Sequence, residues 1–167
     1  MEFAGIYFYF EHQQDKHVLV ICDSSNAHST FEDYEKIKFK LESDQEYEEV
    51  IVSWQRKMSV LPNKVEMKEY NFQNSKQDLL SKSDCEGKGV DGNMGRFFYP
   101  AGFEEMAAGD KVADIRLQQI RAGEEVCIGK SYSKGLRPGY IFKMEGCPQQ
   151  GQNREYITLE TNDKIEA

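Results

Sequence analysis

The run Gly129-Lys130-Ser131 has the residue types with which a phosphate-binding loop ends. Such a loop gathers backbone N–H groups and a helix N-terminus around phosphate, and it needs a further glycine at a fixed earlier position. Here the preceding glycine, Gly123, lies one residue too far away. Glu124 and Glu125 would repel an anion, and a strand and turn pattern follows the run. The sequence therefore predicts a plain strand containing a small residue rather than a nucleotide site.

Gly89, Gly92 and Gly95 form a second glycine pattern, Gly-x-x-Gly-x-x-Gly. Dinucleotide-binding folds place such glycines directly after a buried strand, so that the backbone can approach the pyrophosphate closely. The pattern here lacks that preceding buried strand. It is therefore typical of a flexible loop, and we predict no bound cofactor.

His12 and His17 flank a four-residue link and can face each other across a hairpin. Together with Asp15 or Asp23 they contain the imidazole and carboxylate ligands that suit zinc or nickel. Histidines at hairpin ends are commonly just exposed, and no third ligand has convincing spacing. We therefore predict no metal ligand.

A third group, between the hairpin and the next segment, has the residue types of a nucleophilic triad: Asp23, Ser24, Ser25, His28 and Ser29. Triad members are rarely so close in sequence, and no Gly-x-Ser-x-Gly elbow is present. Aspartate and serine side chains in such clusters commonly bond to nearby backbone N–H groups. The sequence therefore favours turn and cap contacts.

Three acidic pairs could supply general acids, namely Glu48-Glu49, Glu104-Glu105 and Glu124-Glu125. Neighbouring residues point to divergent sides, and a general acid needs desolvation to raise its pKa. These pairs have the pattern of solvated surface. We therefore predict no catalytic residue and no enzymatic activity.

Length and composition describe a single globular chain. Its 167 residues match about one domain and can bury a core without disulfides or a metal. The formal net charge of −8 disfavours nucleic acid as a partner. No apolar run approaches the roughly 18 residues of a membrane span, and the N-terminus MEFAG lacks the positive region of a signal peptide. The absence of a Cys-x-x-Cys pair favours free thiols at Cys22, Cys85, Cys127 and Cys147.

The elements that must position these residues begin with a hairpin. Residues 5–12 and 17–22 are rich in aromatic and β-branched side chains, and a polar link of hairpin length joins them. Phe8, Phe10 and the run Val18 to Cys22 have the pattern of a sheet interior. The acidic segment that follows, up to Glu49, predicts a linker with one weak strand.

The rest of the chain alternates in the manner of strands, apart from one helix. Strands are predicted on either side of Pro62-Asn63, whereas residues 73–102 are polar and end in a glycine-rich loop. Apolar residues then recur at helical spacing, which predicts a helix over about 103–122. Three strands close the chain, with a type II turn at Arg137-Pro138-Gly139-Tyr140.

These segments predict a mainly β fold of the α+β class. A β-barrel domain over residues 50–167 contains the inserted helix, residues 31–49 form an acidic linker, and residues 1–30 form the preceding hairpin.

Taken in order, several motifs resemble VgrG spike proteins of type VI secretion, a family similar to contractile phage tail hubs. They are the hairpin GIYFYFEHQQDKHVLVICDSSNAH, the segment VSWQRKMSVLPNKVEMKEYNF, the step Phe98-Tyr99-Pro100-Ala101-Gly102 with the helix after it, and the closing residues Gly135-Leu136-Arg137-Pro138-Gly139 and Asn153-Arg154-Glu155-Tyr156. Each motif is weak alone, but their joint order covers nearly the whole chain.

The resemblance implies a structural part of a spike base. It implies a homotrimeric hub that docks onto the hexameric Hcp tube and transmits force without bond chemistry. In that family the present residues correspond to the second barrel of the base and to a hairpin of the α/β region before it. The resemblance also implies assembly in the bacterial cytoplasm and export with the apparatus. A free-standing small barrel that acts as an adaptor, or a hub protein of a contractile phage tail, is the alternative. A spike-borne hydrolase lacks a domain to host it.

Overall fold

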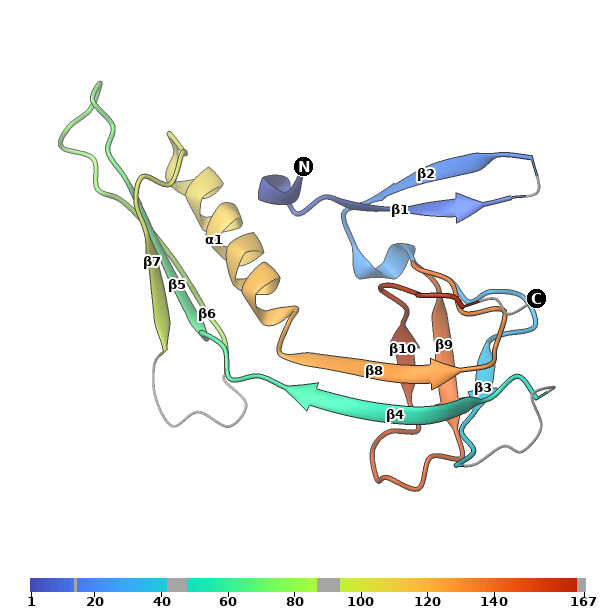
Figure 1. Cartoon of the computed structure of the whole chain (residues 1–167). Helices are drawn as coiled ribbons and strands as arrows, with labels where there is room; N and C mark the ends of the chain where they lie inside the picture. The colour runs from blue at the N-terminus through green and yellow to red at the C-terminus, as the bar shows by residue number, and fades with distance from the viewer. Residues whose placement is uncertain (14, 42–47, 87–93, 165–167) are drawn as a thin grey trace. The chain divides into compact units, whose positions relative to one another are not determined.

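Strands dominate the fold, which Figure 1 shows for the whole chain. The structure is a computed structural model and describes residues 1–13, 15–41, 48–86 and 94–164. The strands are β1 (Tyr7–His12), β2 (His17–Cys22), β3 (Lys36–Lys38), β4 (Ile51–Met58), β5 (Lys64–Glu69), β6 (Leu79–Asp84), β7 (Gly95–Phe98), β8 (Glu125–Ser131), β9 (Ile141–Glu145) and β10 (Glu155–Ile157). Within the described residues one α-helix is present, α1 (Met106–Arg121), with short 3-10 helices at Glu2–Ala4 (η1) and Ser25–Ala27 (η2). The prediction of a mainly β fold with one inserted helix is confirmed.

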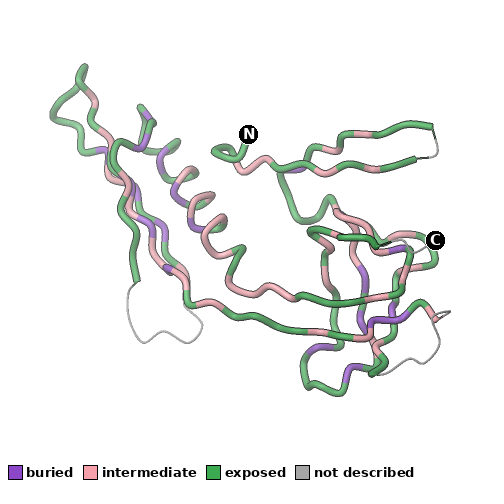
Figure 2. The backbone as a smooth tube through the Cα atoms, in the orientation of Figure 1, coloured by how far each residue is buried: buried purple, intermediate pink, exposed green. Residues whose placement is uncertain are grey.

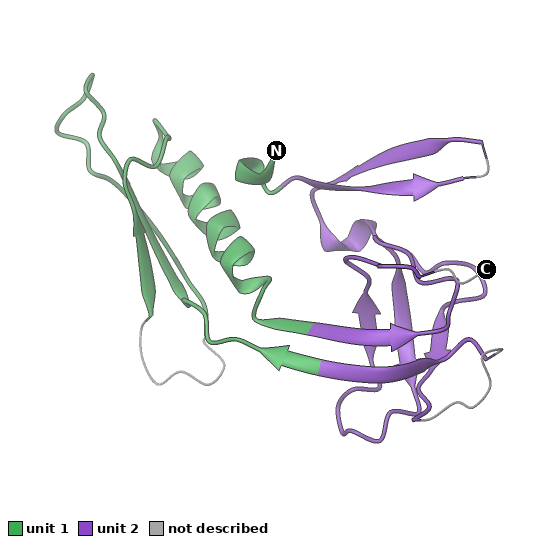
Figure 3. Ribbon diagram, in the orientation of Figure 1, with its two compact units in different colours: residues 1–5, 56–126 green, residues 6–55, 127–167 purple. Residues whose placement is uncertain are grey.

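Internal contacts divide the chain into two units, each made from two separate stretches (Figure 3). Unit 1 contains residues 1–5 and 56–126, and unit 2 contains residues 6–55 and 127–167. Strands β4 and β8 pair with each other, and the division falls within both of them. Each unit has its own hydrophobic core.

Unit 1 is a three-stranded sheet with one helix packed on it. The strand order is β6-β5-β7, in which β5 runs antiparallel to β6 and parallel to β7. Because side chains alternate along a strand, Val65 and Met67 of β5 point into the core while their neighbours face solvent. Helix α1 contributes Ala113 and Leu117 to the same core. A Cβ at Gly109 of α1 would overlap side-chain atoms of neighbouring elements, so only glycine permits this close packing.

Strands β6 and β7 lie within the stretch 73–102, for which the sequence predicts only a polar segment and a glycine-rich loop. That prediction is wrong for these two segments. Leu79, Ser81 and Ser83 of β6 are all buried. Two of the three inward-facing residues are serines, so apolar and polar side chains do not alternate along β6 in the way that predicts a strand.

Unit 2 contains a sheet of order β10-β9-β3, with β9 antiparallel to β10 and parallel to β3. Phe142 and Met144 of β9 and Ile37 of β3 form its core, and the Trp54 ring packs edge-on against Tyr156 at 4.8 Å between centroids. Strand β3 is the weak strand that the acidic linker predicts.

The hairpin β1–β2 also belongs to unit 2 and has the predicted form. Its strands pair antiparallel in a register that places His12 opposite His17, and the Gln13 N–H donates to the Lys16 carbonyl at 2.9 Å across the link. The type II turn is confirmed as well. Gly139 has φ +87°, and the Tyr140 N–H donates to the Arg137 carbonyl at 3.2 Å.

Candidate functional site

The two hairpin histidines meet as the register requires. His12 and His17 lie opposite each other with ring centroids 4.7 Å apart and Nδ1 atoms 2.5 Å apart. A metal centre needs further ligands around such a pair. Among the residues that the structure describes, no group of three or more His, Cys, Asp or Glu side chains is placed to hold an ion.

The triad-like cluster after the hairpin makes structural contacts. The Ser24 hydroxyl accepts from the Asn26 N–H at 3.3 Å and caps η2, as the sequence predicts. His28 Nδ1 lies 2.7 Å from the Gly139 carbonyl, and Nε2 lies 2.7 Å from the Tyr7 hydroxyl. A carbonyl only accepts, so Nδ1 donates to Gly139, while the Tyr7 hydroxyl also donates to the Ser24 carbonyl at 3.0 Å. His28 therefore ties strand β1 to the type II turn.

The run Gly129-Lys130-Ser131 lies in β8, which confirms the prediction of a strand. A Cβ at Gly129 would come within 2.7 Å of the Trp54 ring, so the glycine makes room for the tryptophan. In the other glycine pattern, Gly95 begins β7, while Gly89 and Gly92 lie outside the described residues.

Several residues of the acidic pairs are engaged in ion pairs or backbone contacts. Arg56 binds Glu125 through two hydrogen bonds of 2.8 and 3.0 Å, and Arg121 Nη2 lies 2.7 Å from Glu124 Oε2. The Lys134 N–H donates to Glu49 at 3.0 Å, and this hydrogen bond lowers the pKa of that carboxyl group. A lowered pKa favours the carboxylate, which is the opposite of what a general acid requires.

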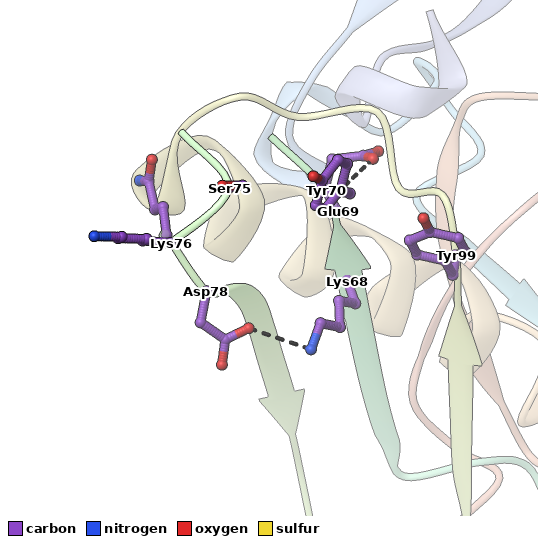
Figure 4. A pocket seen from close by; sticks show the side chains of 8 residues that line it. Lys68, Glu69, Tyr70, Ser75, Lys76, Asp78 and Tyr99 are labelled. Atoms are coloured by element: carbon purple, nitrogen blue, oxygen red, sulfur yellow. Dashed lines mark hydrogen bonds and ion pairs between the residues drawn. The ribbon is translucent and has the colours of Figure 1, made fainter. Parts of the chain in front are cut away.

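An open pocket of about 430 Å³ lies where β5 ends (Figure 4). It joins the end of β5, the loop after it and the residue that follows β7, and its lining residues are Lys68, Glu69, Tyr70, Ser75, Lys76, Gln77, Asp78 and Tyr99. Lys68 Nζ lies 3.3 Å from Asp78 Oδ1. Because it joins segments far apart in sequence, no local motif predicts this pocket.

Glu69 at this pocket acts as a clamp rather than as an acid or base. Its carboxylate accepts from the Gly102 N–H at 2.6 Å and from the Tyr70 N–H at 2.8 Å. These backbone hydrogen bonds, the one from Gly102 first, lower the pKa of the Glu69 carboxyl group. The lining contains two lysines and two acidic residues. The pocket therefore has balanced charge, and two of its four charged side chains are paired with each other.

The two faces of the hairpin differ in exposure, which alternates along both strands (Figure 2). One face is covered by residues of unit 2. Tyr9 lies edge-on to Tyr140, with the ring centroids 6.3 Å apart. Burial raises the pKa of both tyrosines, and the negative charge of Glu11 adds to the effect.

The other face of the hairpin is exposed, and we call it the outer ladder. It consists of three cross-strand pairs, Phe8–Ile21, Phe10–Leu19 and His12–His17. The four apolar side chains are 47 to 56% exposed. The expectation that Phe8 and Phe10 lie in a sheet interior is therefore wrong. Both faces of the hairpin are apolar in sequence, but unit 2 covers only one of them.

Other sequence expectations concern the whole chain. Cys22, Cys85 and Cys147 are free thiols, as predicted. No helix within the described residues is both long and apolar enough to cross a membrane.

Comparison with known proteins places these observations in a family. The family model described as phage tail baseplate hub (GPD) matches residues 1–166. Three curated relatives from Pseudomonas aeruginosa are type VI secretion system spike proteins. VgrG1b is 26% identical, VgrG1a 27% and VgrG1c 25%, each over 160 residues that make up 95% of this chain. The chain aligns with only 22% of the length of VgrG1b and VgrG1c and 25% of VgrG1a.

Proposed function

The chain belongs to the phage tail baseplate hub (GPD) family, and we propose that it forms part of the hub of a type VI secretion spike, docks onto the Hcp tube and transmits mechanical force. The observation that carries this proposal is the extent of the match. The family model covers residues 1–166, and the spike relatives align over 95% of the chain. The family is structural rather than enzymatic.

The proposed assembly follows from the family resemblance. The chain self-associates as a homotrimer, and residues 50–167 with α1 form the barrel that contributes to the ring above Hcp. Residues 1–30 and the linker 31–49 connect this barrel to the preceding region of the hub. Assembly takes place in the bacterial cytoplasm, and the hub leaves the cell with the apparatus.

The packing of the described residues supports a mechanical role. In unit 1, Val65, Leu79 and Ala113 have no exposed surface, so sheet and helix cannot separate without exposing this core to water. In unit 2, the Trp54 N–H donates to Gln152 Oε1 at 3.2 Å, and the Tyr156 hydroxyl donates to the same oxygen at 2.9 Å. Buried side chains and satisfied polar groups resist local opening under load.

The test is binding to Hcp from the same bacterium. We expect the purified chain to co-sediment with assembled Hcp rings, and we expect loss of its gene to abolish release of Hcp into the medium until the wild-type gene is restored. Two results together would contradict the proposal: sedimentation of Hcp that the chain leaves unchanged, and Hcp release from the deletion strain at the parental level.

A further inference from the structure

The pair of histidines beside the hairpin link brings two imidazole nitrogens to one point. His12 and His17 are two of the three histidines of the chain, and both are exposed. Their Nδ1 atoms lie 2.5 Å apart, so the two nitrogens have room for one shared proton between them. A hydrogen bond in contact with water contributes little to stability, so a metal ion can displace this proton at low cost.

We propose that His12 and His17 bind one divalent copper or nickel ion through their Nδ1 atoms. Both rings then carry their proton on Nε2, and water molecules complete the coordination of the ion. This site is open to solvent, unlike a centre closed by three or four protein ligands, which the described residues do not form. The proposal does not depend on the proposed role in a secretion spike.

The register of the hairpin explains why the two rings converge. The Gln13 N–H donates to the Lys16 carbonyl at 2.9 Å, which makes these two residues a hydrogen-bonded position of the ladder. Such positions alternate in antiparallel strands, so His12 and His17 form a non-hydrogen-bonded pair, in which facing side chains lie closest. Both rings leave the same face of the hairpin, with centroids 4.7 Å apart. The sequence alone does not predict this contact, because it depends on the register.

The distance between the nitrogens favours an ion with ligands at right angles. An imidazole nitrogen lies about 2.0 Å from a bound metal ion. Two such nitrogens are therefore about 2.8 Å apart at a right angle and about 3.3 Å apart in a tetrahedron. The rings must separate by about 0.3 Å in the first case and by about 0.8 Å in the second. Copper and nickel adopt the square geometry, whereas zinc prefers the tetrahedral one, so copper and nickel fit the pair better.

The backbone around the pair is held before an ion arrives. Arg137 donates to the His12 carbonyl at 3.4 Å, and the hydrogen bond between Gln13 and Lys16 closes the link on the other side. Ligands that are already in place lose less entropy when the ion binds. The net charge of −8 on the chain also attracts cations to its surface.

The experiment is calorimetric titration of the full chain with nickel chloride at about pH 7.5, where imidazole is neutral. We expect one ion to bind per chain. His12→Ala and His17→Ala should each weaken binding about 100-fold, because a single imidazole loses the advantage of a second ligand held nearby. Nuclear magnetic resonance of the imidazole protons identifies the ligands. Nickel should shift or broaden the signals of His12 and His17 far more than those of His28, which contacts the other end of β1 through Tyr7.

A matched variant separates this site from general metal binding by side chains. The double substitution Lys16→His with His17→Lys keeps the composition and the net charge of the chain. It moves one ring to the opposite face of the hairpin, because neighbouring residues of a strand point to opposite faces. This variant should bind nickel no more tightly than His17→Ala. Both variants keep all four cysteines, so any binding by thiols would persist in them.

Hydrogen exchange tests whether the ion joins the two strands. An ion that binds only the paired hairpin stabilises it, so saturating nickel should slow exchange of the β1 and β2 amides. The amides of β5 and β6 in unit 1 should exchange at the same rate with and without nickel.

Three outcomes would overturn the proposal. The wild-type chain binds nickel no more tightly than His17→Ala. The Lys16→His, His17→Lys variant binds nickel as tightly as the wild type, which would show that the position of the rings does not matter. Exchange of the β1 and β2 amides is the same with and without saturating nickel.

Discussion

The sheet of unit 1 and the hairpin of unit 2 differ in how many apolar faces their strands have and in how many of those faces are covered. In unit 1 the strand β5 has an apolar face, which α1 covers, and a polar face, where Glu66 accepts from Lys64 and Lys82 at 3.0 and 3.2 Å. The hairpin has two apolar faces, and unit 2 covers only one of them. A strand with one apolar face needs one partner, whereas a strand with two needs a second. The hairpin is therefore the region with an apolar face that unit 2 leaves uncovered.

The largest effect should come from truncating matched leucines in the two regions. Leu79→Ala in unit 1 removes a side chain with 0% exposure and should lower the free energy of unfolding by about 3 kcal/mol. Leu19→Ala in the outer ladder should lower it by less than about 1 kcal/mol, because its side chain is already half in water. Urea unfolding of both variants at low concentration measures the difference. Equal costs would show that the ladder is as well covered as the core.

A second pair of variants concerns how the covered face of the hairpin is attached. Gly139→Ala should destabilise the chain by about 2 to 3 kcal/mol, because positive φ strains an alanine and because its Cβ would overlap the Tyr9 ring. Gly151→Ala is the control. Gly151 has φ +78° with no atom within 4 Å of a built Cβ, so only the strain of about 1 kcal/mol remains. If the two glycine variants melt at the same temperature, Tyr9 does not press on the turn.

The sequence predicts local structure in this molecule well. The hairpin, the type II turn and the helix depend on residues near one another, such as Pro138 and Gly139, whose backbone preferences act locally. The glycine of Gly129-Lys130-Ser131 is correctly placed on a strand, but its reason, the Trp54 ring, comes from a residue 75 positions earlier (129 − 54).

What the sequence does not predict depends on tertiary contacts. Strand β6 lacks the apolar alternation that predicts a strand, because two of its inward-facing residues are Ser81 and Ser83. The polarity of a serine gives no sign that a helix will cover it. The alternation of Phe8 and Phe10 correctly predicts a strand but not its burial. Whether an apolar face is covered depends on which other segments reach it, and no local pattern records this.

A smaller effect should follow from truncating two histidines: His28, which contacts the covered face of the hairpin from outside it, and His17, which belongs to the outer ladder. His28→Ala removes the contacts to Tyr7 and Gly139 and should cost about 1 to 2 kcal/mol. His17→Ala on the outer ladder should cost less than about 0.5 kcal/mol. Hydrogen exchange of the β1 and β2 amides measures both. Faster exchange of the β1 amides in His17→Ala than in His28→Ala would show that the hairpin is held through the outer ladder and not through its covered face.

The smallest effect is a dependence on pH that belongs to unit 1. The backbone hydrogen bonds from Gly102 and Tyr70 lower the pKa of Glu69 below its ordinary value of 4.5. A carboxyl group whose pKa is lower in the folded state stabilises the fold above the ordinary pKa. This contribution is lost as the pH falls through the folded-state pKa, when Glu69 takes up a proton.

Glu69→Gln removes this titration while keeping the size of the side chain. Its free energy of unfolding should therefore fall less than that of the wild type between about pH 5 and about pH 3. Asp78→Asn, at the same pocket, is the control, because Asp78 has no backbone clamp of this kind among the described contacts. In the wild type, acid should speed hydrogen exchange at the Gly102 amide, which Glu69 holds, before it affects the amides of the outer ladder strands. If Glu69→Gln keeps the full acid sensitivity of the wild type, the Glu69 carboxylate does not hold the end of β5. The sheet of unit 1 and the outer ladder would then not differ in their dependence on a charged side chain.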